Sequence, residues 1–219
     1  MGGGMPAPAT ESATQPASKA SEADIFSLPD MVDRFQMESI RLGGPVFDLT
    51  KLKWLNGEYI RALAPEDFYA ALRSNVLSDE YLSGIAALIQ TRIETLGQFG
   101  DLTHFFFADN VLPTEEVFVP KKRTLEETLI FAAEQLAVVE ASDWATEALE
   151  AALKKFGEEK GWSVKENFML LRAIVTGGAT SPPMLESLMV FGKARTLDRM
   201  RRFLESQKEI QKRLANQKK

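Results

Sequence analysis

Apolar side chains recur three or four positions apart along most of the chain beyond residue 24, which is the spacing of an amphipathic α-helix. No stretch alternates apolar and polar residues for long enough to indicate a strand. One segment with strand-like composition, Thr103–Phe107, is too short, and we expect it to fill a gap between helices. The pattern therefore predicts an all-α protein. Helices are expected through Met31 to Phe35, after Asp48 or Thr50, from Pro65, over 79–98, from Thr124, and over 146–160 with Gly161 as terminator.

Turn residues predict where several of these helices begin and end. Thr124 opens a sequence with the spacing of a capping box. Further along, the pair Gly177-Gly178 should end one helix, and Ser181 should cap the next, with Pro182 in its first turn. Two helix ends would then lie side by side with exposed backbone N–H groups. This arrangement predicts a small polar pocket with apolar walls.

Composition divides the chain into segments. The first 24 residues are mostly glycine, alanine, proline, serine and threonine, without the branched apolar or aromatic side chains that could bury surface, so we expect a disordered leader. Pro113 and the Pro120–Arg123 segment mark a boundary between two consecutive helical bundle subdomains. The resulting segments are the leader 1–24, a helical segment 25–63, subdomains 64–119 and 120–206, and a basic tail 207–219.

Composition also excludes several classes of function. The chain of 219 residues has no cysteine and one histidine, His104, which removes disulfides and thiolate zinc sites and leaves little scope for triad chemistry. We therefore expect no cofactor, no metal and no catalytic residue. No apolar run approaches the roughly 18 residues that a membrane span needs, and the N-terminus lacks a signal-peptide pattern. We expect a cytoplasmic protein.

Charge is distributed unevenly along the chain. The formal net charge is -5, whereas the segment from Lys193 onward holds ten lysines and arginines against Asp198, Glu205 and Glu209. Two interpretations stand. The charges form either a solvated helix face with a basic tail, or a patch that attracts phosphate groups.

Two segments of the sequence resemble a known family. The order Leu171-Arg172, Thr176-Gly177, Ser181-Pro182-Pro183 and Gly192-Lys193 resembles the anticodon-binding end of bacterial glutamyl-tRNA synthetases, which are class I aminoacyl-tRNA synthetases. Phe47–Arg61 resembles the point in that family where the stem-contacting domain gives way to the anticodon-binding half. The resemblance extends from near residue 25 to near residue 206. It implies the α-helix cage of the C-terminal anticodon-binding half, with 25–63 as a remnant of the stem-contact domain.

This resemblance implies a role in reading RNA. The sequence lacks the H-x-G-H and Lys-Met-Ser-Lys-like motifs with which such enzymes activate their amino acid, so we expect no catalysis by this chain alone. The implied partner is the anticodon loop of tRNA(Glu), in support of aminoacylation, with a separate catalytic half as a further partner. A monomer without membrane contact is expected. The alternative is a freestanding helical interaction protein, derived from this domain, that binds a protein partner.

The resemblance also implies which residues bind RNA. Arg92 matches a family position that separates glutamate tRNA from glutamine tRNA at the third anticodon base. An arginine there suits the acceptor atoms of a cytosine. Lys193 and the basic helix after it are expected to hold phosphates. The positions that fall where the family contacts anticodon bases are Arg172, Ser181, Pro182 and Met184.

Overall fold

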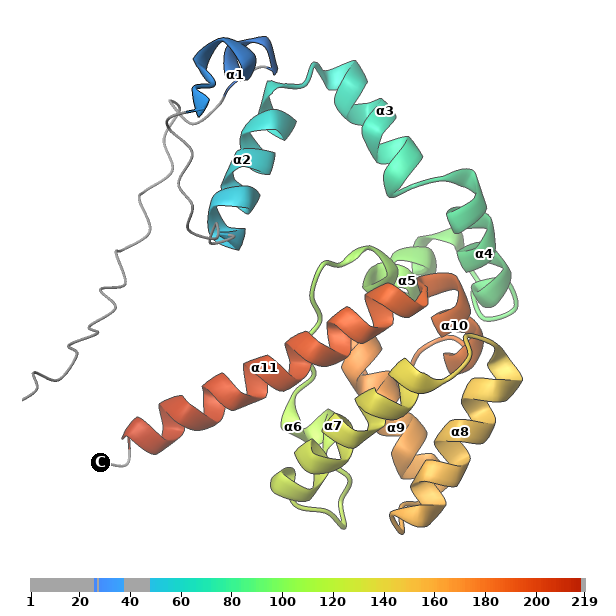
Figure 1. Cartoon of the computed structure of the whole chain (residues 1–219). Helices are drawn as coiled ribbons and strands as arrows, with labels where there is room; N and C mark the ends of the chain where they lie inside the picture. The colour runs from blue at the N-terminus through green and yellow to red at the C-terminus, as the bar shows by residue number, and fades with distance from the viewer. Residues whose placement is uncertain (1–25, 27, 38–47, 218–219) are drawn as a thin grey trace, which may run out of the picture. The chain divides into compact units, whose positions relative to one another are not determined.

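The computed structural model describes residues 26, 28–37 and 48–217, and Figure 1 shows the course of the chain. Every regular element in those residues is helical, which confirms the all-α prediction. No helix in the same residues could span a lipid bilayer. The structure divides into two compact units, one up to Ala71 and one from Leu72 onward. The expected leader, residues 1–24, lies outside the described residues.

The first unit contains α1 (Leu28–Arg34), α2 (Leu49–Ala62) and the beginning of α3 (Pro65–Asn75). The predicted start of α2 is confirmed, because the Asp48 carboxylate accepts hydrogen bonds from two backbone N–H groups of the first turn. None of the described side chains of α1, α2 and α3 is buried. The described part of this unit therefore has helices with apolar faces but no core.

The second unit is built around a helical core. Its elements are α4 (Asp79–Ile89), a short 3-10 helix (Leu96–Gln98), α5 (Phe99–Phe107), α6 (Glu115–Phe118), α7 (Leu125–Ala141), α8 (Thr146–Glu159), α9 (Val164–Thr176), α10 (Met184–Phe191) and α11 (Lys193–Gln217). α8 packs against both α7 and α9, and the long α11 runs along α7, α9 and α10 (Figure 1). α10 also contacts α4 and α8, while α5 and α6 contact α9. Large buried side chains, among them Phe106, Leu171 and Phe203, fill the space between these helices.

Two predicted helix boundaries in this unit are confirmed. The Thr124 backbone N–H donates to the Glu127 carboxylate at 2.8 Å, and the Glu127 N–H donates to the Thr124 hydroxyl oxygen at 3.2 Å. This reciprocal pair is the capping box expected at the start of α7. At the end of α8, Gly161 has a φ of 66°, a left-handed conformation that costs glycine little.

The helix expected over 79–98 is shorter in the structure. It ends at Ile89 as α4, and the chain turns before it enters the 3-10 helix. The Gln98 side chain instead caps a new start here, because its Oε1 accepts hydrogen bonds from the backbone N–H groups of Glu94 and Thr95 at 2.7 and 3.3 Å, just before the 3-10 helix. A side chain that satisfies these groups competes with a continuous helix. The prediction of one continuous helix is therefore wrong beyond residue 89.

The phenylalanine-rich segment Thr103–Phe107 is helical, as the second half of α5. The Thr103 hydroxyl donates to the Phe99 carbonyl one turn earlier, at 2.6 Å. Phe105 and Phe106 are 2% and 0% exposed. The two rings do lie between helices as expected. Their burial in the core overrides the strand-like composition, because β-propensity depends on tertiary context.

The predicted boundary between two helical subdomains, at residues 119 and 120, lies inside the second unit. α4 and α5 belong to the predicted subdomain 64–119, and they contact α10 and α9, which belong to 120–206. The bounds of the two subdomains therefore stay a prediction.

Candidate nucleic-acid interface

The junction between α9 and α10 begins at a glycine, as predicted. α9 ends at Thr176, and Gly177 follows with a φ of 77° while its N–H donates to the Ala173 carbonyl at 2.8 Å. A Cβ at Gly177 would lie 3.0 Å from the Cβ of Val111. Glycine is needed here for the left-handed backbone and for the close approach of the segment that follows α5. The end of α9 is thus held at a defined place.

The start of α10 differs from the prediction. The helix begins at Met184 with Pro183 at the N-cap, and the Ser181 hydroxyl donates to the Pro182 carbonyl at 2.8 Å instead of capping the helix. Pro183 is the reason, because a residue before proline is disfavoured in the helical conformation and Pro182 therefore stays outside the helix. Ser181 is partly exposed, whereas Pro182 and Met184 are buried. The two buried side chains form an apolar wall at this end of α10.

Arg172 lies in the last part of α9, shortly before the glycine turn. Its side chain is half-buried, and its Nε is buried without a hydrogen-bond acceptor among the described residues. An unpaired buried donor costs about 1–3 kcal/mol, and this one is closed to solvent, so only the partly exposed remainder of the side chain is open to a ligand. Arg172 and Ser181 therefore flank the junction, the first with an unpaired Nε and the second with a hydroxyl that donates to the Pro182 carbonyl.

Arg92 is exposed in the turn after α4, where its backbone N–H donates to the Ile89 carbonyl at 2.7 Å. In the described part of the chain, no hydrogen bond or ion pair joins Arg92 to Arg172 or Ser181. The helix before Arg92, α4, contacts α10, and whether Arg92 acts together with the junction stays a prediction. A Cβ at Gly84 of α4 would lie 3.4 Å from the Val190 side chain of α10.

Lys193, expected to hold a phosphate, has a structural contact. Its Nζ donates to the carbonyl of Ser142, the C-cap residue of α7, at 2.8 Å. The cations after it are largely engaged as well. The contacts are Arg195 with Tyr81 and the Phe106 carbonyl, Arg201 with Glu140, and Arg202 with Asp109 and Asp198. The sequence suggested either a solvated face or a phosphate patch for this basic helix. Neither interpretation included the contacts by which its cations hold other parts of the fold.

Sequence reasoning missed Arg199, which is 3% exposed. Its guanidinium donates to three backbone carbonyls, those of Val175, Phe105 and Ala108. Burial, and secondarily the charge of Arg195, lowers the pKa of Arg199 to about 10. One signal was available in the sequence. Arg199 stands at helical spacing with the buried positions Thr196, Met200 and Phe203, where a basic residue is unusual.

A cleft of about 830 Å³ lies at the other end of α9, beside the N-termini of α7 and α9. Its lining includes the cations Lys121, Lys122, Arg123 and Lys165. Arg123 is engaged there, because its guanidinium lies 4.7 Å from the centre of the Trp162 ring and donates to the Gly161 carbonyl. The described residues contain no group of three or more histidine or carboxylate side chains that could bind a metal ion.

Comparison with known proteins identifies a family to which this chain is similar. The family model described as "Anticodon binding domain" matches residues 57–204. A glutamate–tRNA ligase of Pseudomonas fluorescens is 32% identical over 194 residues, which cover 86% of this chain and 38% of that protein. Another, from Mycolicibacterium smegmatis, is 37% identical over 192 residues, which cover 83% of this chain and 39% of that protein. The chain therefore spans well under half the length of these relatives.

A solved structure has a similar fold. The crystal structure of a glutamate tRNA ligase from Elizabethkingia meningosepticum, in complex with its amino acid, matches with a TM-score of 0.53 at 24% sequence identity. The match covers 83% of this chain and 37% of that one. At this identity, the likeness concerns the fold alone.

Proposed function

This chain belongs to the anticodon binding domain family, and on that premise we propose that it recognises the anticodon loop of tRNA(Glu) as the non-catalytic part of a glutamate–tRNA ligase. The similarity to two glutamate–tRNA ligases supports this choice of tRNA. Proteins usually read single-stranded RNA by stacking splayed bases on side chains and by hydrogen bonds to the base edges. The α9–α10 junction combines an apolar wall with polar side chains, which suits both contacts. Work in translation would place the protein in the cytoplasm.

The partly exposed side chain of Arg172, just before the glycine turn, is the observation that carries the proposal. An arginine at such a place is suited to an RNA base, because its guanidinium has several donors and the edge of a base offers acceptors. We assign the first two anticodon bases to the junction. Arg172 and Ser181 would hydrogen bond to base edges, while the buried Pro182 and Met184 would support the turn that carries Ser181.

Arg92 would read the third anticodon base. Its side chain is exposed, so the guanidinium is accessible to RNA from the turn after α4. Its fixed donors suit the acceptors of a cytosine and meet a guanine differently. We expect Arg92→Gln to relax the choice between the two bases by about 1–3 kcal/mol.

Two RNA hairpins test the proposal. One carries the glutamate anticodon CUC and the other the glutamine anticodon CUG, so they differ only at the third base. The full chain should bind the first more tightly, and Arg92→Gln should remove most of that preference. Arg73→Gln is the matched control, because it deletes the same charge from an exposed arginine that pairs with Asp79 at 2.8 Å, away from the junction. Equal binding of both hairpins by the parent chain at low salt would contradict the proposed function.

Lys193 would add a phosphate contact without sequence preference. An ammonium group has three donors, so it can keep the Ser142 carbonyl and still reach a phosphate oxygen. We expect Lys193→Met to weaken binding of both hairpins alike and to reduce the slope of log affinity against log salt by about 1.

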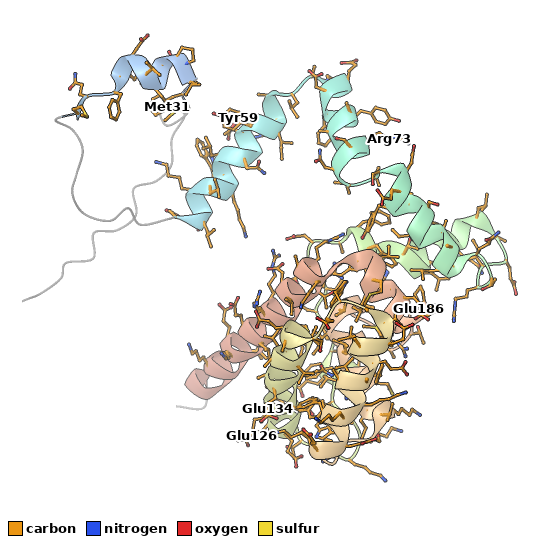
Figure 2. All side chains as sticks on the ribbon, turned by 45° about the vertical axis from the view of Figure 1, so that its right-hand side comes forward. Met31, Tyr59, Arg73, Glu126, Glu134 and Glu186 are labelled. Atoms are coloured by element: carbon orange, nitrogen blue, oxygen red, sulfur yellow. The ribbon has the colours of Figure 1, made fainter. Side chains whose placement is uncertain are left out.

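The chemistry of aminoacylation would come from polypeptide outside this chain. The relatives are much longer than the part that this chain matches. The first unit also offers apolar faces to a partner. Met31 in α1 is 57% exposed and Tyr59 in α2 is 51% exposed (Figure 2). A catalytic half that covers these faces is the partner we propose, and the chain alone should not activate glutamate with ATP.

A further inference from the structure

We propose that Arg199 is a positioning residue for anticodon reading, because it holds the end of α9 at the place that the junction requires. The inference rests on the proposed function and assigns a task that neither the sequence motif nor the family match indicates. Arg199 has no access to RNA itself, since only 3% of its surface is exposed. Its effect would pass through the backbone that it binds.

The guanidinium joins the ends of two helices. One nitrogen donates to the Val175 carbonyl in the last turn of α9, and another donates to the Phe105 carbonyl of α5 at 2.7 Å and to the carbonyl of Ala108. Carbonyls in the last turn of a helix have no partner within the helix. The three acceptors lie on two elements, and the planar fork of an arginine can reach them from one rigid group.

These contacts determine where the junction begins. Val175 is two residues before Gly177 and three after Arg172, so the bond to its carbonyl fixes the last turn of α9. Ala108 leads into the segment that contains Val111, which packs against Gly177. Arg199 therefore holds both sides of the contact between Val111 and Gly177.

A third contact brings in α10. The Arg199 guanidinium lies 4.4 Å from the centre of the Phe191 ring, at the last residue of α10. The cation–π contact means that one side chain of α11 touches the end of α9, the end of α5 and the end of α10. Phe191 lies at the opposite end of α10 from Met184, so Arg199 holds the α9 side of the junction directly and contacts α10 at its far end.

Arg195 is a suitable control because it is the next cation on the same face of α11. Its guanidinium also lies over Phe191, at 4.3 Å, and donates to the Tyr81 hydroxyl oxygen and the Phe106 carbonyl, both at 2.7 Å. It has no hydrogen bond to α9 among the described residues. A variant of Arg195 therefore loses a charge and a contact with Phe191, while the bond to Val175 stays in place.

The test measures how tightly the full chain and its variants bind each of three RNA hairpins. The anticodons are CUC, CAC with the second base changed, and CUG with the third base changed. Arg199→Met removes the guanidinium altogether. Where this variant does not fold, Arg199→Lys replaces it. The lysine keeps the charge, but a single ammonium cannot reproduce the planar fork of the guanidinium. Each variant is assayed below its own unfolding temperature, as followed by circular dichroism.

We expect Arg199→Lys to lose about tenfold of the preference for CUC over CAC, while its preference for CUC over CUG changes less than twofold. Arg195→Met should keep the preference for CUC over CAC, because the bond between Arg199 and Val175 stays in place. A folded Arg199→Lys with an unchanged second-base preference overturns the inference, and so does an equal loss at both bases, which indicates general loosening. If the parent chain shows no preference at all, the proposed function fails and the inference fails with it.

Discussion

α2 in the first unit and α9 in the second are helices of 14 and 13 residues, and a side chain caps the start of each. They differ in what covers their apolar faces. α9 buries seven of its residues, whereas α2 buries none among the described residues. Caps and spacing thus predict where a helix forms, because both are local signals. Burial depends on partners far away in the sequence, which α9 finds in α5, α6, α8 and α11.

The largest expected difference between the units is the response to loss of a phenylalanine. Phe203 of α11 is 1% exposed and meets the Phe118 ring edge-on at 5.0 Å, so Phe203→Ala should lower the free energy of unfolding by about 3–5 kcal/mol. Phe35, which follows α1, is 63% exposed, and Phe35→Ala should change the free energy of unfolding by less than about 0.5 kcal/mol. Urea unfolding followed by circular dichroism measures both. A large effect of Phe35→Ala would show that the first unit is covered in the free chain.

The same glycine-to-alanine change should act in opposite directions in the two units. A Cβ at Gly157 in α8 would lie 2.9 Å from the Asn167 amide nitrogen and 3.3 Å from the Trp162 carbonyl. That amide nitrogen donates to the Leu153 carbonyl, while the Asn167 side-chain oxygen accepts from buried Gln135. Gly157→Ala should therefore cost about 1–3 kcal/mol by disturbing a buried polar network.

Gly57 in α2 is the counterpart. Its nearest neighbour for a Cβ is the end of the Arg61 side chain, 3.1 Å away, and that side chain is 62% exposed and flexible. Because alanine favours a helix over glycine by about 1 kcal/mol, Gly57→Ala should raise the helical signal in circular dichroism. A loss of helix with Gly57→Ala, or no loss of stability with Gly157→Ala, would remove the contrast.

The sequence predicted correctly those local structures that depend on residues close together in the chain. The Thr124 capping box and the glycine turn at Gly177 were predicted, because each acts within a few residues. The start of α10 was predicted wrongly at Ser181, because the double proline overrides the serine cap. The helical state of Thr103–Phe107 depends on burial in a core that no short pattern specifies.

The candidate site divides in the same way. Arg172 and Ser181 are close in sequence on either side of one turn, so the motif order was enough to predict that they flank it. The position of Arg92 depends on packing between α4 and α10, about a hundred residues apart, which spacing along the chain does not reveal. The contacts of Arg199 also cannot be predicted from spacing along the chain, because its acceptors are backbone carbonyls, which are present at every residue.

The smallest expected difference concerns the helix caps. The Ser163 hydroxyl oxygen accepts the Glu166 N–H at 3.2 Å in the capping box of α9, and Ser163→Ala should cost about 0.5–2 kcal/mol in global unfolding. Asp48→Ala removes the cap of α2 and should reduce only the helical signal of the first unit, since no described side chain of α2 is buried. An equal shift of the main unfolding transition by both variants would contradict this.

The capping box of α9 should also make the stability of the second unit depend on pH. Hydrogen bonds from the Ser163 hydroxyl and backbone N–H lower the pKa of Glu166 from its usual 4.5. On acidification, the unfolded chain therefore takes up this proton before the folded chain does. The carboxylate contributes stability above pH 4.5, and this contribution is lost as the pH falls through the lower folded-state pKa. Glu166→Gln should be slightly less stable than the parent at neutral pH, with the difference shrinking in acid, as urea unfolding at several pH values would measure. A difference that stays constant down to low pH would mean that the capping box of α9 contributes nothing through the charge of Glu166.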